Sequence, residues 1–201
     1  MKAVTLYLAS ASPRRREILN QLGIPHEVLA QDIDESKYPA ETPDEFVCRL
    51  AKAKAESALA SLPKSANAAC LGSDTTVVCE NEIFEKPEDE DDALRILSKL
   101  SGRTHQVLTA VALATRNTTD VLLSISQVTF RELTDAEIRA YWSSGEPADK
   151  AGAYGIQGLG ALFVEAMEGS YSGIMGLPVM ETTRLLEKVN LTPELILGGK
   201  L

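Results

Sequence analysis

Two hydroxyls and two guanidinium groups occur together in the segment Ser-Ala-Ser-Pro-Arg-Arg at residues 10–15. The segment follows an apolar run, residues 5–9, that is typical of a short buried strand, and Ser12 with Pro13 is a favourable start for a helix. A helix N-terminus has free N–H groups and the positive end of the helix dipole, so it attracts anions. The segment therefore predicts either a polyphosphate site with charge-assisted hydrogen bonds, or a capped helix whose arginines face solvent.

Asp74 is a carboxylate within an apolar stretch. It belongs to Gly-Ser-Asp-Thr-Thr at residues 72–76, inside a run from residue 69 to residue 78 that we interpret as a strand interrupted at Gly72. An unpaired buried carboxylate is costly, so we expect Asp74 to be paired or to lie at a strand end that faces a cleft. It could serve as a general base for water or as a magnesium ligand. The alternative is an Asx-turn residue at the strand break.

Other groups allow both a functional and a structural interpretation. The carboxylates of residues 32–35 could bind a hard cation or form a solvated acidic loop. Lys54 and Lys86 could contact phosphates or be surface lysines. Residues 149–158 are rich in glycine, which permits close approach of the backbone to a ligand, and the amide of Gln157 could hydrogen-bond the edge of a base.

Helix and strand patterns alternate along the chain, which predicts an α/β protein around a mixed sheet. Capping boxes at Thr42–Glu45 and Thr134–Glu137 indicate helix starts. Two long apolar runs joined by a polar turn predict a hairpin over residues 107–128. The further expected elements are helices at residues 12–22, 93–100 and 178–189, a tight turn at residues 80–82, a glycine-rich loop at residues 152–160 and a strand at residues 162–164.

The composition limits the class of protein. The 201 residues are 44% hydrophobic and 24% charged, which is ordinary for a globular chain. A net charge of −9 argues against nucleic-acid binding through the overall field. The three cysteines form no Cys-x-x-Cys pair, so we expect neither a disulfide framework nor a zinc site, and His105 is interpreted as a core residue. Without a long apolar run or a signal peptide, the chain is expected to be cytoplasmic and to have no membrane partner.

From Leu6 to about Glu187 the chain resembles the Maf family of nucleoside triphosphate pyrophosphatases. The resemblance rests on colinear motifs: residues 10–15, Leu-Ala-Lys-Ala-Lys-Ala at 50–55, Gly-Ser-Asp-Thr at 72–75, Glu-Lys-Pro at 85–87, Leu-Ser-Gly-Arg-Thr-His at 100–105, residues 149–158, and Gly-Leu-Pro at 176–178. Their common order makes the match far more specific than any single motif.

The resemblance implies one family domain over residues 1–201, with a mixed, elongated central sheet flanked by helices and two lobes with an active-site cleft between them. It implies hydrolysis of a nucleoside triphosphate between the α and β phosphates, giving a monophosphate and pyrophosphate. It also implies a divalent metal cation, Mg²⁺ or Mn²⁺, and a homodimer. The partner is then a small nucleotide and not a nucleic acid.

Carried onto matching positions, the resemblance implies that Asp74 accepts the proton of water, and that Glu35 and Asp74 hold the metal. The residues implied to bind the substrate are Ser10, Arg14, Arg15, Lys54, Lys86 and Gln157.

Substrate choice is implied by Arg14, Thr75 and Gln157, which match the branch of the family that acts on dTTP and UTP. The branch that acts on 7-methyl-GTP has Trp, Gln and Glu at these places. Three alternatives stay open: a 7-methyl-GTP pyrophosphatase, a pyrophosphatase for modified purine nucleotides, and a regulatory protein linked to septum formation that binds nucleotide without turnover.

Overall fold

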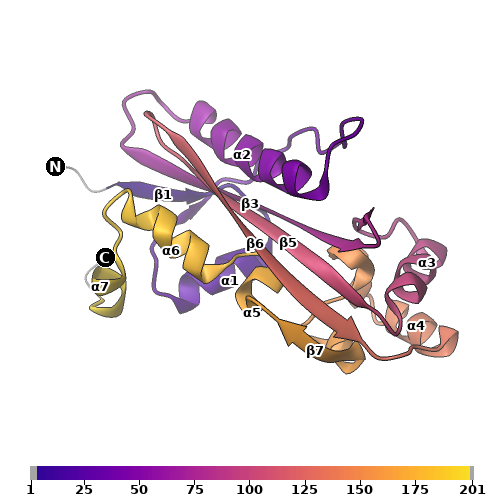
Figure 1. Ribbon diagram of the computed structural model, residues 1–201. Coiled ribbons are helices and arrows are strands. Elements are labelled where there is room, and N and C mark those ends of the chain that lie inside the picture. Colours follow the sequence, from indigo (N-terminus) through magenta and orange to yellow (C-terminus); the bar gives the residue numbers. More distant parts are fainter. Residues whose placement is uncertain (1–3, 200–201) are drawn as a thin grey trace. The chain divides into compact units, whose positions relative to one another are not determined.

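Strands from the whole length of the chain pair into one mixed sheet in the computed structural model, which describes residues 4–199 (Figure 1). Within these residues the strand order is β2-β1-β3-β5-β6-β7, and β4 pairs with β3. β1 is parallel to β2 and to β3, whereas β4 is antiparallel to β3 and β7 is antiparallel to β6. The strands are β1 (Thr5–Leu8), β2 (Glu27–Val28), β3 (Ala68–Cys79), β4 (Glu82–Phe84), β5 (Thr104–Ala114), β6 (Thr119–Phe130) and β7 (Val164–Glu168).

Helices alternate with the strands, which confirms the predicted mixed α/β class. Pro13 and Pro43 each take the first position of a helix, where the missing N–H costs nothing. Both expected capping boxes form, at Thr42 and at Thr134. The helices are α1 (Pro13–Gln21), α2 (Pro43–Ser61), α3 (Glu90–Leu100), α4 (Asp135–Trp142), α5 (Tyr171–Ile174), α6 (Val179–Glu187) and α7 (Pro193–Leu197), with 3₁₀ turns η1 (Glu146–Asp149), η2 (Ala151–Ala153) and η3 (Leu159–Phe163).

The chain divides into two compact units, and three long strands pass through both. The first unit holds the residues up to Asp74, residues 109–124 and the residues from Gly176 onward. Within it, α2 lies on one side of the strands and α1 and α6 lie on the other (Figure 1). The buried side chains of α1 and α2, among them Leu19, Phe46 and Leu50, supply apolar surface to this unit.

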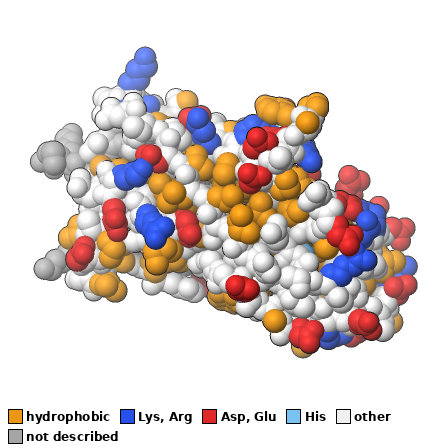
Figure 2. Space-filling model, viewed as in Figure 1, with side chains coloured by type: hydrophobic (Ala, Val, Ile, Leu, Met, Phe, Trp, Pro, Cys, Tyr) orange, Lys and Arg blue, Asp and Glu red, His pale blue; other side chains and the backbone are white. Residues whose placement is uncertain are grey.

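The second unit comprises Thr75–Leu108 and Ile125–Met175 and has an aromatic core. His105, Phe130 and Tyr154 meet edge to face there, with ring centroids 4.7 to 5.5 Å apart. The helices α3 and α4 pack against each other, and acidic and basic side chains are interspersed over them on the face seen in Figure 2. Ion pairs such as Arg139 to Glu90, at 2.8 Å, account for this mixture.

Two expected elements differ from those in the structure. β3 is not interrupted at Gly72 but continues through it. The missing side chain of Gly72 instead lets the backbone of α2 approach the strand. The strand expected at residues 162–164 is wrong: residues 159–163 form η3, and the strand is β7, at Val164–Glu168. β7 is largely exposed, so it carries no apolar run that would mark it in the sequence.

The short helices α5 and α7 were not expected, since four or five residues are too few to show a helical period.

Cys48, Cys70 and Cys79 are free thiols. Of the helices within residues 4–199, none combines the length and the apolar character needed to cross a membrane.

Candidate active site

Asp74 lies inside β3 as a buried carboxylate, with 8% of its surface exposed. Its Oδ1 atom accepts a hydrogen bond of 2.7 Å from Nζ of Lys54, which projects from α2. The same ammonium group lies 2.6 Å from Oε1 of Glu35. One lysine therefore bridges the two carboxylates that the resemblance assigns to metal binding, and the Asx-turn alternative for Asp74 is wrong.

Gly72 explains how α2 comes close enough to β3 for this contact. A Cβ atom at Gly72 would lie 2.3 Å from the carbonyl oxygen of Ala51 and 2.7 Å from the nitrogen of Ala55, both on α2. Lys54 comes one residue before Ala55, and Asp74 comes two residues after Gly72. The close helix–strand approach therefore places the lysine opposite the carboxylate.

Burial raises the pKa of the Asp74 carboxyl above its usual value, although the nearby charges of Lys54 and Arg15 pull it the other way. A carboxylate with a raised pKa is a stronger base, and so it is better suited to take a proton from water. The environment of Asp74 thus fits a general base.

The loop that carries Glu35 is fastened to α2 by Arg49. Its guanidinium group forms two hydrogen bonds with Glu41, of 2.6 and 2.8 Å, and donates a third, of 3.0 Å, to the carbonyl of Ser36. It also stacks 4.0 Å from the centroid of the Tyr38 ring. Arg49 and Lys54 both project from α2, so the loop is attached to this helix at Glu35 and also at Ser36 and Glu41. Arg49 was not predicted from the sequence, because its partners Ser36 and Glu41 lie in a loop without a regular period.

Ser10 and Arg15 meet at the start of α1. Ser10 Oγ accepts a hydrogen bond of 3.0 Å from Nη1 of Arg15, and the Nε of Arg15 donates to the carbonyl of Gly176 at 2.8 Å. Ser12 does not cap the helix with its side chain; instead its N–H donates to Ser10 Oγ at 3.2 Å. The N–H groups of the first helical turn therefore lie beside a hydroxyl and a guanidinium, as an anion site requires.

Gly176 connects this corner to the strand of Asp74. Ser73 is fully buried, and its Oγ lies 2.9 Å from the carbonyl oxygens of both Ala110 and Gly176. Arg15 and Ser73 thus share one acceptor, which fixes the neighbour of Asp74 and the side chain of Arg15 together. Ser73 was not predicted from the sequence either, because its contact with Gly176 joins residues more than 100 positions apart.

Lys86 and Gln157 belong to the second unit, and both are exposed. The structure ties their two segments together through a hydrogen bond of 3.0 Å from the N–H of Gly152 to the carbonyl of Glu85. Gly152 has a φ of +71° and packs against Val77, where a Cβ atom would lie 2.6 Å from the valine side chain. A glycine is therefore required at this point of the loop.

Arg14 and Thr75 complete the predicted set. Arg14 is half-buried in the first turn of α1, and Thr75 is half-buried on β3 directly after Asp74. The structure therefore brings Ser10, Arg15, Glu35, Lys54 and Asp74 into two contact groups of the first unit, with Arg14 and Thr75 as sequence neighbours.

His105 is a structural residue, as expected. Its Nε2 lies 2.9 Å from the hydroxyl of Tyr154 inside the aromatic core. Burial lowers the pKa of His105 to about 4, so the ring is neutral at neutral pH.

The donor set limits which metal the site could bind. Within residues 4–199, His, Cys, Asp and Glu side chains form no group of three at a spacing that would hold a metal ion. The carboxylates of Glu35 and Asp74 flank a position that the positively charged ammonium of Lys54 occupies in the structure. Mg²⁺ is commonly held by one or two carboxylates together with phosphate oxygens and water, so this pair fits it.

Comparison with known proteins gives a family and close relatives. The family model described as "Maf-like protein" matches residues 5–189. The dTTP/UTP pyrophosphatase of Saccharophagus degradans is 54% identical over 185 residues, which cover 90% of this chain and 87% of the relative. The proteins of the same name from Pseudoalteromonas atlantica and Escherichia coli O157:H7 are 48% and 50% identical, over 94% and 92% of this chain and 99% and 93% of theirs.

A solved structure, that of the Staphylococcus aureus Ham1 protein, aligns with 63% of this chain and 71% of its own. Its identity is 16% and its TM-score 0.44, too low a similarity to support an argument about the site.

Proposed function

Because the chain belongs to the Maf family, we propose that it is a hydrolase that cleaves dTTP and UTP between the α and β phosphates, releasing pyrophosphate and the nucleoside monophosphate. The structural observation that supports the proposal is the buried Asp74 paired with Lys54, in the unit that also holds Ser10 and Arg15. This combination supplies a base and cations, which hydrolysis of a phosphoanhydride needs.

Asp74 is proposed as the general base. Its carboxylate orients a water molecule and takes its proton as the oxygen attacks the α phosphorus. Lys54 keeps Asp74 ionised in its buried position, because the ammonium opposes the effect of burial on the carboxyl pKa.

Substrate binding is proposed for the remaining cations. Arg14, Arg15, Lys54 and Lys86 neutralise the phosphates, and Ser10 adds a hydroxyl beside the helix N-terminus. The same cations stabilise the charge on the departing pyrophosphate. Local positive charge is needed because the protein as a whole carries a net charge of −9.

A divalent cation, Mg²⁺ or Mn²⁺, is proposed at Glu35 and Asp74. When bound, such a cation neutralises phosphate charge and polarises the phosphoryl oxygens. Lys54 contacts both carboxylates, so it must share them with the cation or move to a phosphate. Full turnover in excess EDTA would contradict the metal requirement.

Gln157 is proposed to select the base. Its amide can donate and accept at once, which matches the carbonyl and N–H groups on the edge of uracil and thymine. CTP presents an amino group and an unprotonated N3 at that edge and should be a poorer substrate. Arg14 and Thr75 are proposed to contribute to substrate specificity together with Gln157.

We further propose that the protein acts as a nucleotide house-cleaning enzyme in the cytoplasm. We also propose that it forms a homodimer, which size-exclusion chromatography with light scattering checks.

The decisive experiment identifies the products formed from dTTP and UTP. We expect pyrophosphate and the monophosphate in equal amounts. Free phosphate and a nucleoside diphosphate would instead indicate cleavage of the terminal phosphate. Binding of dTTP without any product would favour a regulatory protein.

Substrate selectivity is tested by kcat/KM for dTTP, UTP, CTP, GTP and 7-methyl-GTP. We expect kcat/KM to be highest for dTTP and UTP. A lead for 7-methyl-GTP or another purine nucleotide would contradict the pyrimidine assignment and leave pyrophosphate release as a separate question.

A further inference from the structure

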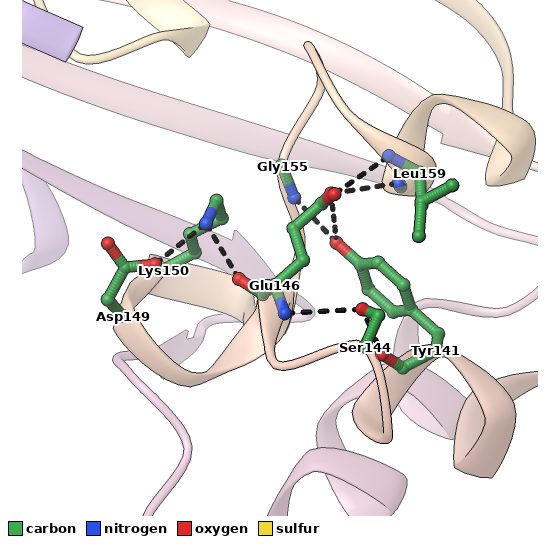
Figure 3. A network of polar contacts seen from close by, with 8 residues as sticks. Tyr141, Ser144, Glu146, Asp149, Lys150, Gly155 and Leu159 are labelled. Atoms are coloured by element: carbon green, nitrogen blue, oxygen red, sulfur yellow. Dashed lines mark hydrogen bonds and ion pairs between the residues drawn. The ribbon is translucent and has the colours of Figure 1, made fainter.

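Glu146 lies at the centre of a polar network beneath the glycine-rich loop (Figure 3). Its Oε1 accepts hydrogen bonds from the hydroxyl of Tyr141, at 2.8 Å, and from the N–H of Gly160, at 3.0 Å. Its Oε2 accepts one of 2.8 Å from the N–H of Leu159. The Tyr141 hydroxyl in turn accepts one of 3.0 Å from the N–H of Gly155.

These contacts fasten the loop on both sides of Gln157. Gly155 is two residues before Gln157, and Leu159 and Gly160 are two and three residues after it. Gln157 itself is exposed, so its own packing does little to fix it. The orientation of its amide therefore depends on the backbone that Glu146 and Tyr141 hold.

The loop fits closely around the carboxylate. A Cβ atom at Gly158 would lie 2.2 Å from Oε2 of Glu146, and one at Gly160 would lie 2.8 Å from the Tyr141 hydroxyl. Glycines at these positions allow the backbone to approach Glu146 and Tyr141. The glycine-rich sequence is thus matched to an internal carboxylate, in addition to any role toward a ligand.

Glu146 acts here as an anion that binds the loop. Burial raises its pKa, but the hydrogen bonds from Gly160, Leu159 and Tyr141 outweigh burial, and the net pKa is lowered. The carboxylate is therefore ionised at neutral pH and accepts charge-assisted hydrogen bonds. The ammonium of Lys150 lies 2.6 Å from the backbone carbonyl of Glu146 and does not replace the loop N–H groups.

We propose that Glu146 is a positioning residue that holds residues 155–160, and through them Gln157, in the conformation that selects uracil or thymine over cytosine. This inference rests on the proposed function, in which Gln157 contacts the base. Glu146 contacts no substrate atom in this proposal and acts only through the loop.

Glu146→Gln tests the proposal. The amide keeps the size of the side chain but turns one acceptor oxygen into a donor, which then faces an N–H or O–H group. We expect the amides of Leu159 and Gly160 to exchange hydrogen at least tenfold faster than in the wild type. We also expect the ratio of kcat/KM for dTTP over CTP to fall by about tenfold or more, mainly through a higher KM for dTTP.

Glu137→Gln is the matched control in the same unit. Glu137 also accepts hydrogen bonds from a backbone N–H and a hydroxyl, those of Thr134, but it caps α4 and lies outside the loop. This variant is expected to keep the wild-type ratio of dTTP to CTP. Tyr141→Phe, which removes the acceptor for Gly155, should change the ratio in the same direction as Glu146→Gln.

A double-mutant cycle separates positioning from a general structural role. If Glu146 acts through Gln157, Glu146→Gln will change the dTTP to CTP ratio very little in a protein that already carries Gln157→Ala. An equal effect in both backgrounds, or unchanged amide exchange in Glu146→Gln, would overturn the inference. A wild-type protein that releases no pyrophosphate would contradict the proposed function instead, and amide exchange, which needs no substrate, would still decide whether Glu146 holds the loop.

Discussion

At the level of single residues, Lys54 is the cation that contacts both carboxylates of the candidate site. It contacts Glu35 and Asp74 at 2.6 and 2.7 Å, and only 12% of its side chain is exposed. A buried carboxylate without a partner tends to take up a proton. The Lys54 ammonium opposes this effect of burial on the pKa of the Asp74 carboxyl.

Asp74→Asn should abolish turnover and largely preserve nucleotide binding, because the amide keeps the shape but cannot accept the proton of water. Loss of a general base typically lowers the rate ~10²–10⁴-fold. The measurements are kcat for dTTP and the dissociation constant of a non-hydrolysable analogue. Asp120→Asn, which removes a carboxylate paired with Lys188 in the same unit, is the control. If Asp74→Asn keeps more than about a tenth of the wild-type kcat, the base is another group.

Lys54→Met should move the acid limb of the pH–rate profile to higher pH. Burial raises the pKa of Asp74 and Lys54 lowers it, so removal of the ammonium lets the carboxyl pKa rise further. More of the base is then protonated at a given acidic pH, and kcat/KM falls earlier as the pH is lowered. Lys52→Met removes an exposed lysine of the same helix that pairs with Glu56, and should leave the limb in place. An acid limb that does not move in Lys54→Met would show that Asp74 does not control it.

The contact between α2 and β3 is the feature that matters at the level of elements. Gly72→Ala should destabilise the protein by about 1–3 kcal/mol, because the new methyl group meets backbone atoms of Ala51 and Ala55 that can move only if the helix moves. Displacement of α2 also separates Lys54 from Asp74, so activity should fall further than stability alone explains.

Thr42→Ala is the control for the Gly72 prediction. It removes the Thr42 hydroxyl from the capping box of the same helix at a cost of about 1 kcal/mol but leaves the approach to β3 intact. Urea unfolding and kcat/KM are measured on both variants. Equal activity in Gly72→Ala and Thr42→Ala would contradict the link between the helix–strand contact and the site.

Local patterns predicted most of the elements, because they are encoded by neighbouring residues. The Pro13 start of α1, the capping boxes at Thr42 and Thr134 and the hairpin over residues 107–128 are all confirmed. β7 could not be predicted, since an exposed edge strand obtains its stability from backbone pairing with β6 and shows no apolar alternation.

The site was predictable by residue type and motif but not by contact. The sequence shows that Asp74 is a carboxylate in an apolar run, but only the fold shows that Lys54 and Glu35 meet it. The roles of Ser73 and Glu146 depend on backbone groups, Gly176 and Leu159, that are supplied by other segments. A hydrogen bond to a backbone atom requires no particular side chain on the residue that supplies that atom, so a pattern of side chains does not reveal the bond.

For the molecule as a whole, a negative protein is proposed to bind a polyanion. The net charge of −9 repels a nucleoside triphosphate at long range, whereas Arg15 and Lys54 are proposed to attract it at contact distance. Salt screens charges that are separated by more than a Debye length, about 8–10 Å, and affects close, partly buried pairs much less. Moderate salt should therefore weaken substrate binding less than it would for a protein whose attraction acts at long range.

The stability of the whole molecule should depend on the buried His105. Its pKa is about 4 in the folded protein and 6.5 in an exposed chain, so the unfolded state binds a proton at a higher pH than the folded state. The contribution of the neutral ring to the free energy of unfolding is therefore complete above about pH 6.5 and is lost as the pH falls toward 4. Between pH 7 and pH 5 this loss amounts to about 2 kcal/mol.

His105→Phe removes the titrating ring and should remove this part of the pH dependence. The variant also loses the contact of 2.9 Å with the Tyr154 hydroxyl, so its stability is expected to be lower at every pH. The informative quantity is the difference between the free energies of unfolding at pH 7 and pH 5, measured by urea denaturation, which that constant loss does not affect. The difference should be smaller in His105→Phe than in the wild type by about 2 kcal/mol. An unchanged difference in His105→Phe would mean that the ring takes up a proton as readily in the folded protein as in the unfolded chain, which is incompatible with its burial in the aromatic core.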